Sequence, residues 1–279
     1  MKTPNVRITI LVDNVAGEGL LPEHGLSLWI ETGGLRILFD TGQGEAQPEN
    51  AHRLGLPLDK ADFIVLSHGH YDHSGGLASA LEAASHAICV LHPAALRTRF
   101  SRPPGGPARS IGMPSASRAA ADGLPLGRLR FSSSPMELAP GIGLTGSIPR
   151  DSFFEDSGGP FFRDAEGLEK DLFEDDQALW IRGPEGLVVC TGCCHAGLIN
   201  TLEAARSLSG VPEIRAVIGG FHLLYADEER LGRTLDALDL LSPTRLVPCH
   251  CTGEAAVRAL EGRFGGRVTA GRSGSILEF

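Results

Sequence analysis

Four side chains that commonly bind metals lie within six residues of one another in the first third of the chain. The segment reads His68-x-His70-x-Asp72-His73 and directly follows the apolar run at residues 63–66. His68 and His70 are two residues apart, so both can project to one side where the backbone is still extended. Imidazole and carboxylate ligands together suit zinc, iron or manganese. The segment therefore predicts a divalent-metal site at the end of a strand.

Three later segments carry histidine beside small residues, and each follows a predicted strand. They are residues 191–195 (Thr-Gly-Cys-Cys-His), 219–222 (Gly-Gly-Phe-His) and 249–253 (Cys-His-Cys-Thr-Gly). In layered α/β folds the strand ends line the site. We therefore expect His195, His222 and His250 to lie near the first segment.

These motifs resemble those of one large family. Ser-His-Gly-His-Tyr-Asp-His-Ser-Gly-Gly matches the signature of the metallo-β-lactamase superfamily, and Leu-Phe-Asp-Thr-Gly at 38–42 resembles its earlier aspartate motif. Asp-Asp-Gln-Ala-Leu at 175–179 and the three histidine segments are similar to the branch named for dihydropterin ribofuranosylaminobenzene-phosphate synthase. The resemblance covers nearly the whole chain. It implies an α/β fold of four layers, the αββα sandwich.

The resemblance also implies two divalent metal ions, with zinc favoured over manganese or iron. Superfamily members usually supply a third histidine to the first metal, a bridging aspartate, and a last histidine to the second metal. Because the chain has no histidine between residues 92 and 195, His195 is the expected third ligand and His250 the last, with His222 as its competitor. Cys193 stands where the bridging aspartate would fall, and a thiolate binds zinc well.

A pair of metals can lower the pKa of a water held between them and so generate a hydroxide nucleophile. Asp72 is then the expected catalytic residue, because it would bind the second metal and orient the hydroxide. Asp40 is expected to support the loop without binding metal. We therefore expect a metal-dependent hydrolase of a small anionic substrate, phosphorylated or pterin-like.

Two alternatives remain open at this point. A phosphodiesterase or a lactonase of the same superfamily would use the same metals on a different bond. A protein of another class would hold redox iron and bind a signal or an electron carrier without hydrolysing anything. Metal content distinguishes the classes, because the ligand types alone accept several metals.

Two unusual segments follow the metal motif and supply the expected substrate contacts. An irregular insertion lies at about 97–125, and its first part, residues 97–118, contains five arginines and no acid. We expect this insertion to cap the site and recruit an anion. A loop at about 151–176 holds ten acids and five phenylalanines, which would stack a ring or seal a dimer. Single residues expected to contact substrate are His92, Arg150, Glu155 and Gln177.

The cysteines allow a second interpretation. Cys190 alternates with Val189 in a predicted strand and is expected in the core. Cys190, Cys194, Cys249 and Cys251 also have spacings that permit a separate structural zinc site. The histidines between them favour a shared site instead.

The elements that must position these motifs alternate along the chain. Apolar and β-branched runs predict strands at 6–12, 26–31, 35–39, 63–66, 87–91, 178–182, 187–190, 214–218 and 245–248. Helices are expected at 44–56, 77–84, 198–208, 228–241 and 254–264. Strands followed by helices of this length indicate layered α/β packing.

Length and composition limit the class of protein. With 279 residues, 42% hydrophobic, the chain can bury a large core, and we expect one domain over 1–279. A formal net charge of −9 argues against a general nucleic-acid binder. No apolar run is long enough to span a bilayer, and residues 1–12 lack the apolar core of a signal peptide. We therefore expect a cytoplasmic enzyme with a small-molecule substrate, no nucleic-acid or membrane partner, and room for a homo-oligomer.

Overall fold

The computed structural model describes residues 6–279 and contains two large sheets that face each other. The first sheet has the strand order β16-β1-β2-β3-β4-β5-β8. Its strands are β1 (Val6–Val12), β2 (Ser27–Thr32), β3 (Leu35–Phe39), β4 (Phe63–Val65), β5 (Ile88–Leu91), β8 (Leu129–Phe131) and β16 (Ile276–Glu278). The hairpin β2–β3 turns at Gly33 and Gly34, both at positive φ, which only glycine adopts without strain.

The second sheet has the order β15-β14-β13-β12-β10-β9. Its strands are β9 (Met136–Ala139), β10 (Ile142–Leu144), β12 (Leu179–Gly183), β13 (Gly186–Thr191), β14 (Ile214–Gly220) and β15 (Arg245–Cys249). Strands β13, β14 and β15 run parallel, so their carboxyl ends lie at one edge of the sheet. The three histidine segments predicted to share a site follow these three strands.

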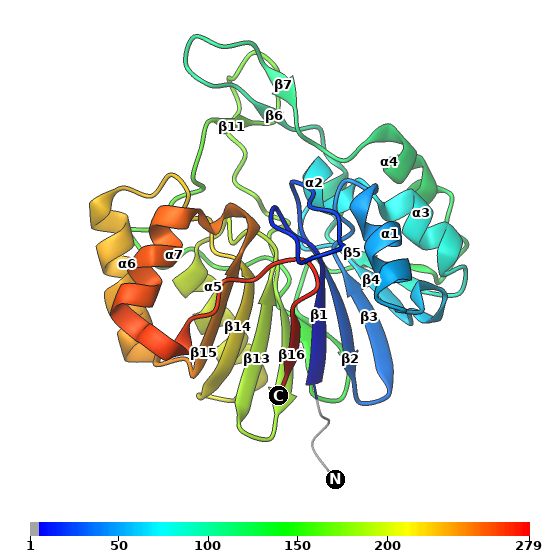
Figure 1. Cartoon of the computed structure of the whole chain (residues 1–279). Helices are drawn as coiled ribbons and strands as arrows, with labels where there is room; N and C mark the ends of the chain where they lie inside the picture. Colours follow the sequence, from blue (N-terminus) through cyan, green and yellow to red (C-terminus); the bar gives the residue numbers. More distant parts are fainter. Residues whose placement is uncertain (1–5) are drawn as a thin grey trace.

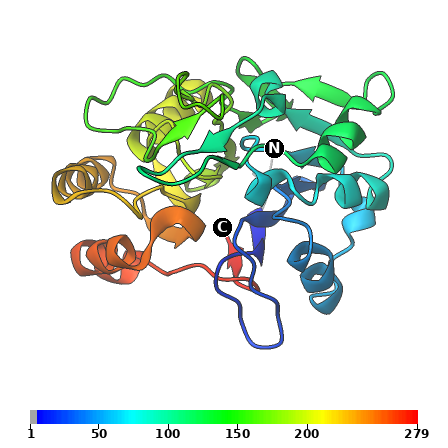
Figure 2. The same ribbon diagram turned by 90° about the horizontal axis from the view of Figure 1, so that it is seen from above.

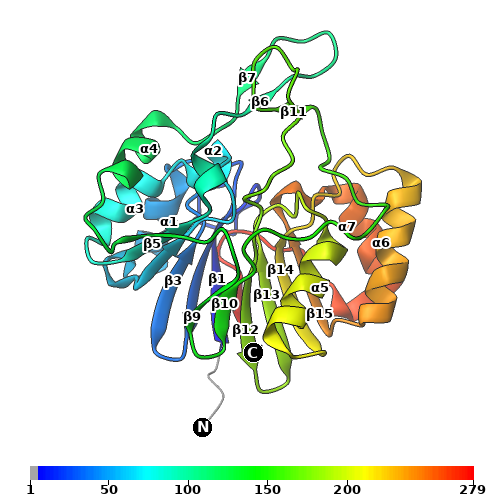
Figure 3. The ribbon, with the colours of Figure 1, turned by 180° about the vertical axis from the view of Figure 1, so that it is seen from behind.

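Helices cover the outer face of each sheet (Figures 1 and 3). The first sheet carries α1 (Ala46–Arg53), α3 (Leu77–Ala83) and α4 (Ser115–Asp122), and the second carries α5 (Leu198–Ser209), α6 (Glu228–Leu241) and α7 (Glu254–Phe264). Seen from above, the two helical layers lie on opposite sides of the sheets (Figure 2). This arrangement confirms the expected four-layer αββα sandwich.

Alternation along the strands divides the core into three apolar layers. In β13, Val188 and Cys190 point between the two sheets, while Leu187 and Val189 point toward the helices. Successive strand side chains face opposite sides of a sheet, and both faces here are covered. The strand is therefore apolar throughout, and Cys190 lies in the core as predicted.

Short elements complete the chain. The helix α2 (Tyr71–Ser74) contains the end of the metal motif, and the 3₁₀ turns are Leu58–Lys60, Pro93–Leu96, His250–Thr252 and Gly265–Arg267. Within residues 6–279, no helix combines the length and the apolar character needed to cross a bilayer. Residues 1–5, which entered the argument about a signal peptide, lie outside the described part.

The insertion at 97–125 is more ordered than expected from its proline content. Its strands β6 (Phe100–Ser101) and β7 (Arg109–Ser110) form a small sheet with β11 (Phe161–Phe162) of the acidic loop, and its end forms α4. Pro114 is the N-cap of α4 in extended backbone, where a missing N–H costs little. We call the small sheet and its connections the lid, because Figure 1 shows it standing above the edge where the two large sheets meet.

Candidate metal centre

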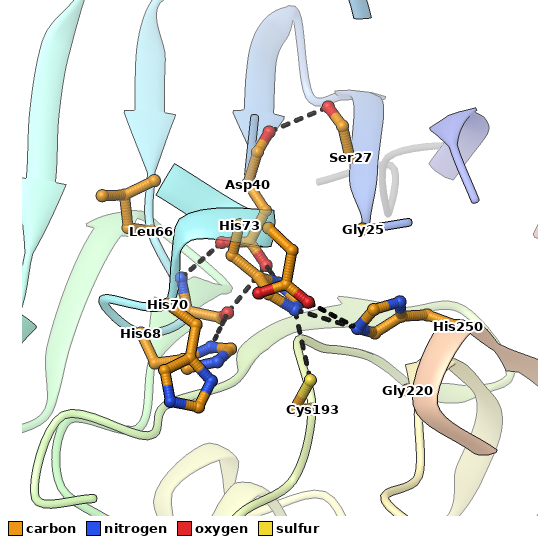
Figure 4. Close-up of polar contacts among 12 residues, drawn as sticks. Gly25, Ser27, Asp40, Leu66, His68, His70, His73, Cys193, Gly220 and His250 are labelled. Carbon is orange, nitrogen blue, oxygen red and sulfur yellow. Dashed lines mark hydrogen bonds and ion pairs between the residues drawn. The ribbon is translucent and has the colours of Figure 1, made fainter. Parts of the chain in front are cut away.

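Asp40, directly after β3, organises the loop that follows β4. Its carboxylate accepts hydrogen bonds from Ser67 N, Ser67 Oγ and His73 Nδ1, each at 2.7 Å, and it is fully buried. Because His73 donates through Nδ1, its Nε2 is left to face the centre of the site. Asp40 thus occupies the supporting position expected for it (Figure 4).

His68, His70 and His195 form one group of potential ligands. One ring nitrogen of each lies within 4.8 Å of the others, and His195 Nε2 is 3.3 Å from His70 Nδ1. The Nε2 atoms of His68 and His70 are buried without a hydrogen-bond partner. Burial lowers the pKa of His70 to about 3 and holds the pKa of His68 and His195 well below the usual range. All three imidazoles are therefore neutral at neutral pH, as metal ligands must be.

Asp72, His73 and His250 form a second group beside the first. His73 Nε2 is 3.3 Å from His250 Nε2, which is 3.4 Å from Asp72 Oδ2. Contacts on the side away from the other ligands fix the position of His250. Asn14 Oδ1 lies 2.9 Å from its Nδ1, and Asp13 Oδ1 accepts from its backbone N–H at 2.7 Å. The structure thus brings together the six residues expected to complete the two sites.

Protonation differs between the two groups. Burial alone would lower the pKa of His73, but the charge and the hydrogen bond of Asp40 raise it to about 9. Burial would raise the pKa of Asp72, but hydrogen bonds from His24 and His250 hold it well below the usual range. The second group therefore carries a proton on His73 that a metal must displace.

Cys193 lies between the two groups. Its Sγ is 3.2 Å from His73 Nε2, and it lies within 4.8 Å of ligand atoms of both His68 and His195. Figure 4 shows the thiol pointing toward His73 and His250. The thiol therefore lies where the resemblance placed a bridging ligand.

His222 lies at the edge of the first group. Its ring centroid is 4.2 Å from that of His195, and it forms a further ligand group with His195 and Cys193. Neither of its buried ring nitrogens has a hydrogen-bond partner. It adjoins the three-imidazole group, whereas His250 occupies the second.

Sequence reasoning missed two residues at this centre. His24, which belongs to none of the sequence motifs, has its Nε2 3.2 Å from Asp72 Oδ2 while 56% of its side chain stays exposed. Cys251, whose spacing also permitted a separate zinc site, donates from its thiol to the carbonyl of Cys193 at 3.6 Å and forms a ligand group with Cys193 and His250. His24 does not follow the end of a predicted strand, so neither its residue type nor its spacing indicated a metal site. Cys251 adjoins His250 and could have been included in the predicted centre.

Several residues here have unusual backbone conformations. Asp40, Phe173, Cys194, His222 and His250 all have φ between 47° and 61°, the left-handed region that non-glycine residues rarely adopt. Such strain persists only where the surroundings over-determine it, and it clusters at functional sites. Its concentration here supports a functional role for this edge of the sheets.

A cavity of about 220 Å³ opens over the ligand groups. Apart from the histidines, cysteines and Asp72, its walls are mostly aromatic or aliphatic: Tyr71, Ser101, Ile111, Phe161, Leu224 and Tyr225. Ser101, Ile111 and Phe161 come from the lid. No arginine or lysine among the described residues lines this cavity.

The four expected substrate contacts do not line this cavity. His92 accepts from Ala94 N and lies 3.0 Å from Ser147 Oγ, and Arg150 donates to the carbonyl of Leu172. Two others support neighbouring backbone. Glu155 accepts from the first N–H groups of α5, and Gln177 donates to the carbonyl of Leu66. Their geometry therefore gives them structural partners in place of the substrate contact we expected.

Two arginines of the insertion, Arg97 and Arg99, are paired with acids of the loop that follows. Arg97 pairs with exposed Glu174 at 2.7 Å, and Arg99 is buried between Asp171 and Asp175. Arg99 therefore does not face an incoming anion, contrary to our expectation. The opposite charges of the two segments hold the lid together.

The separate cysteine site does not form in the part of the chain that the structure describes. No group of three or more potential ligands there includes Cys190, Cys194 or Cys249. Cys190 and Cys249 lie in the apolar layer between the sheets, and Cys194 lies in the layer under α5. Burial raises the pKa of each thiol, which disfavours the thiolate.

The residues present fit bound divalent metal ions. Buried nitrogen atoms without hydrogen-bond partners, a carboxylate and a thiol converge from four strand ends. In His73 and in His250 the other ring nitrogen, Nδ1, contacts a side-chain oxygen, that of Asp40 and of Asn14 respectively. Metal-binding histidines usually have such partners. Converging neutral imidazoles without a bound cation would leave their acceptors unsatisfied, at a cost in folding free energy.

Comparison with known proteins places this centre in a family. The sequence profile of the metallo-beta-lactamase superfamily matches residues 20–208. The chain is 31% identical to 7,8-dihydropterin-6-methyl-4-(beta-D-ribofuranosyl)-aminobenzene-5'-phosphate synthase of Methanocaldococcus jannaschii, with 100% of this chain and 98% of the relative aligned. An uncharacterized protein of the same organism is 33% identical over 91% of this chain and 93% of its own length.

A solved structure agrees with the sequence comparisons. Tm1679, described as a metal-dependent hydrolase of the beta-lactamase superfamily, superposes with a TM-score of 0.83 at 33% identity, over 98% of this chain and 99% of its own. Proteins of this superfamily bind divalent metals, and the ligand groups described above supply candidate histidine, aspartate and cysteine ligands. On the matched profile and the full-length relatives, the chain belongs to the metallo-β-lactamase superfamily.

Proposed function

We propose that the protein is a hydrolase that holds two divalent metal ions, with zinc favoured, and acts on a small anionic substrate. The observation that carries this proposal is the pair of adjacent ligand groups under one cavity, with Cys193 between them. His68, His70 and His195 would hold one ion. Asp72, His73 and His250 would hold the other.

Metal ions bound here would supply Lewis-acid chemistry, polarising the attacked group and lowering the pKa of water. The residues of the chain orient that chemistry. Asp40 fixes the ring of His73 through a 2.7 Å hydrogen bond, and Asn14 does the same for His250. The lid residues Ser101, Ile111 and Phe161 line the cavity above these groups.

Asp72 and His24 offer a path for a proton between the centre and solvent. Asp72 Oδ2 would accept a proton released at the centre, and His24 Nε2 lies 3.2 Å from that oxygen. Because much of the His24 side chain is exposed, it can exchange protons with water. Catalytic proton transfer needs this hydrogen-bond reach.

Charge favours an anionic substrate even though no arginine or lysine of the described residues lines the cavity. The imidazole ligands carry no charge, so two divalent ions facing only Asp72 and the thiolate of Cys193 would leave the centre positive. The aromatic side chains of Tyr71, Phe161 and Tyr225 line the cavity beside it. A substrate with a flat ring and a phosphate or carboxylate, such as a phosphorylated or pterin-like compound, would match both features.

A second candidate is the reaction named for the Methanocaldococcus jannaschii synthase. Its support is the alignment over the whole of both chains at 31% identity. A phosphodiesterase or lactonase would share the metals, whereas an iron-binding redox or signalling protein would not hydrolyse.

Metal analysis and a substrate panel test the proposal. We expect two zinc or manganese ions per chain, and hydrolysis of a phosphate ester, a phosphodiester or a lactone. Asp72→Ala should lose one ion and nearly all hydrolysis, while the matched exposed variant Asp59→Ala should keep both. Iron with visible absorbance and no hydrolysis would overturn the proposal, as would an Asp72→Ala variant that keeps two ions and full rate.

A further inference from the structure

Arg99 has a buried guanidinium inside a segment that is otherwise largely exposed. Its side chain is 2% exposed. Its Nε lies 2.6 Å from Asp171 Oδ2, its Nη1 donates to Asp175 Oδ2 at 2.7 Å, and its Nη2 contacts Asp175 Oδ1. A buried charge is tolerated only when it is paired and hydrogen-bonded. Both carboxylates are therefore tied to the position of Arg99.

Asp175 continues this network into the metal loop. Its Oδ2 also accepts from Gly69 N at 2.8 Å, and Gly69 separates His68 from His70. A second connection runs through the lid backbone, where Ile111 N donates to Arg99 O at 2.9 Å and Tyr71 N donates to Ile111 O at 3.0 Å. The loop that presents two imidazoles is thus held on both sides by the lid.

Phe173 carries the network to the third imidazole. The guanidinium of Arg99 lies 5.4 Å from its ring centroid. The same ring stacks on His195 at 3.9 Å with an interplanar angle of 7°, and meets His70 edge-on at 5.2 Å. Phe173 adopts this pose at a φ of 50°, a strained conformation for a bulky residue. The strain is maintained by the hydrogen bond from Phe173 N to Asp171 Oδ1 at 2.9 Å.

We propose that Arg99 is a positioning residue that couples the lid to one metal site, the three-imidazole group of His68, His70 and His195. This inference rests on the proposed function, because it assigns a metal to that group. Arg99 acts through Asp175 on the loop and through Phe173 on His195. Among the described residues, no hydrogen bond or ring contact joins Asp72, His73 or His250 to Arg99, Asp175 or Phe173, and His73 and His250 are held by Asp40 and Asn14 instead. A substitution of Arg99 that weakens these contacts should therefore lower the metal affinity of the three-imidazole group and leave that of the second group unchanged.

The test isolates each site in turn. Asp72→Ala leaves the three-imidazole group, and His195→Ala leaves the second group. Arg99→Lys is introduced into both backgrounds, because lysine keeps the charge but cannot make the bidentate contact. Arg97→Lys is the matched control, since Arg97 lies in the same segment and pairs with exposed Glu174. Zinc affinity is measured against a competing chelator.

Partners that orient metal ligands are worth about ten- to a hundred-fold in metal affinity. We expect Arg99→Lys to weaken zinc binding by that factor in the Asp72→Ala background. In the His195→Ala background, Arg99→Lys should change the zinc affinity by less than about two-fold, because substitutions at distant sites usually act independently. Equal weakening in both backgrounds would indicate general destabilisation and overturn the proposal, as would no weakening in either. Arg97→Lys should leave both affinities unchanged.

A readout without metal separates this inference from the proposed function. In the metal-free protein, Arg99→Lys should speed hydrogen exchange at the Gly69 amide, while amides of β1 stay protected. Unchanged exchange at Gly69 would refute the coupling. If the Asp72→Ala chain binds no zinc at all, the proposed two-metal function fails, and the Gly69 result still decides whether Arg99 positions the loop.

Discussion

Replacing Asp40 by asparagine should change how zinc binding depends on pH. In the wild type, Asp40 raises the pKa of His73 to about 9, so His73 is protonated in the metal-free protein at neutral pH. Zinc must displace that proton. Below the pKa, apparent affinity therefore rises about tenfold per pH unit, and about two units below it the cost is about 2.7 kcal/mol.

In Asp40→Asn the charge that most raises the pKa of His73 is gone, so burial, which lowers that pKa, is opposed mainly by the smaller effects of Asp72 and Cys251. The ring should then be neutral at about pH 7, and the release of one proton per bound metal should disappear. Loss of the ring's partner should still weaken binding by about ten- to a hundred-fold where protonation no longer matters. The two binding curves should therefore approach each other or cross as pH falls.

The assay is zinc competition at several pH values in the His195→Ala background, which leaves the second group alone. Burial raises the pKa of the Cys193 thiol, so a proton from that thiol contributes equally to both proteins. The slope of affinity against pH should fall by about one proton per metal. If the Asn variant were weaker by the same factor at every pH while remaining folded, the argument from His73 would be refuted.

Three further outcomes follow from single contacts. Gly69→Ala should lower the free energy of unfolding by about 1–3 kcal/mol, because its Cβ would lie 2.1 Å from the carbonyl oxygen of Ala95; a wild-type denaturation midpoint would contradict the close approach. Cys190→Ser should lower the free energy of unfolding by about 1–3 kcal/mol, because it buries a hydroxyl, but it should keep the metal content. Loss of metal from this variant would indicate that Cys190 is a metal ligand. Cys193→Ser should remove thiolate-to-metal absorption from the cobalt-substituted protein, and an unchanged spectrum would exclude Cys193 as a ligand.

Local pattern predicted layered α/β packing and histidines at strand ends, whereas the four-layer sandwich and the assignment of ligands to two metals came from the resemblance of the motifs to a family. The predicted helices at 228–241 and 254–264 match α6 and α7, because apolar spacing and a polar start are properties of the segment itself. The histidines came together because they follow strands whose carboxyl ends share an edge. His195 and His250 could therefore be chosen from their positions along the chain.

Pairing between distant segments was decided only by the tertiary structure. Arginines of the insertion suggested an anion site, yet Arg99 is neutralised by Asp175, 76 residues away in the sequence. His24 belongs to no sequence motif, and only the fold places it beside Asp72. Charge and residue type are local properties, but whether a cation faces substrate or a buried carboxylate depends on which segments pack together. For this protein, strand ends and motif spacing therefore located the centre, and long-range packing determined which side chains serve it.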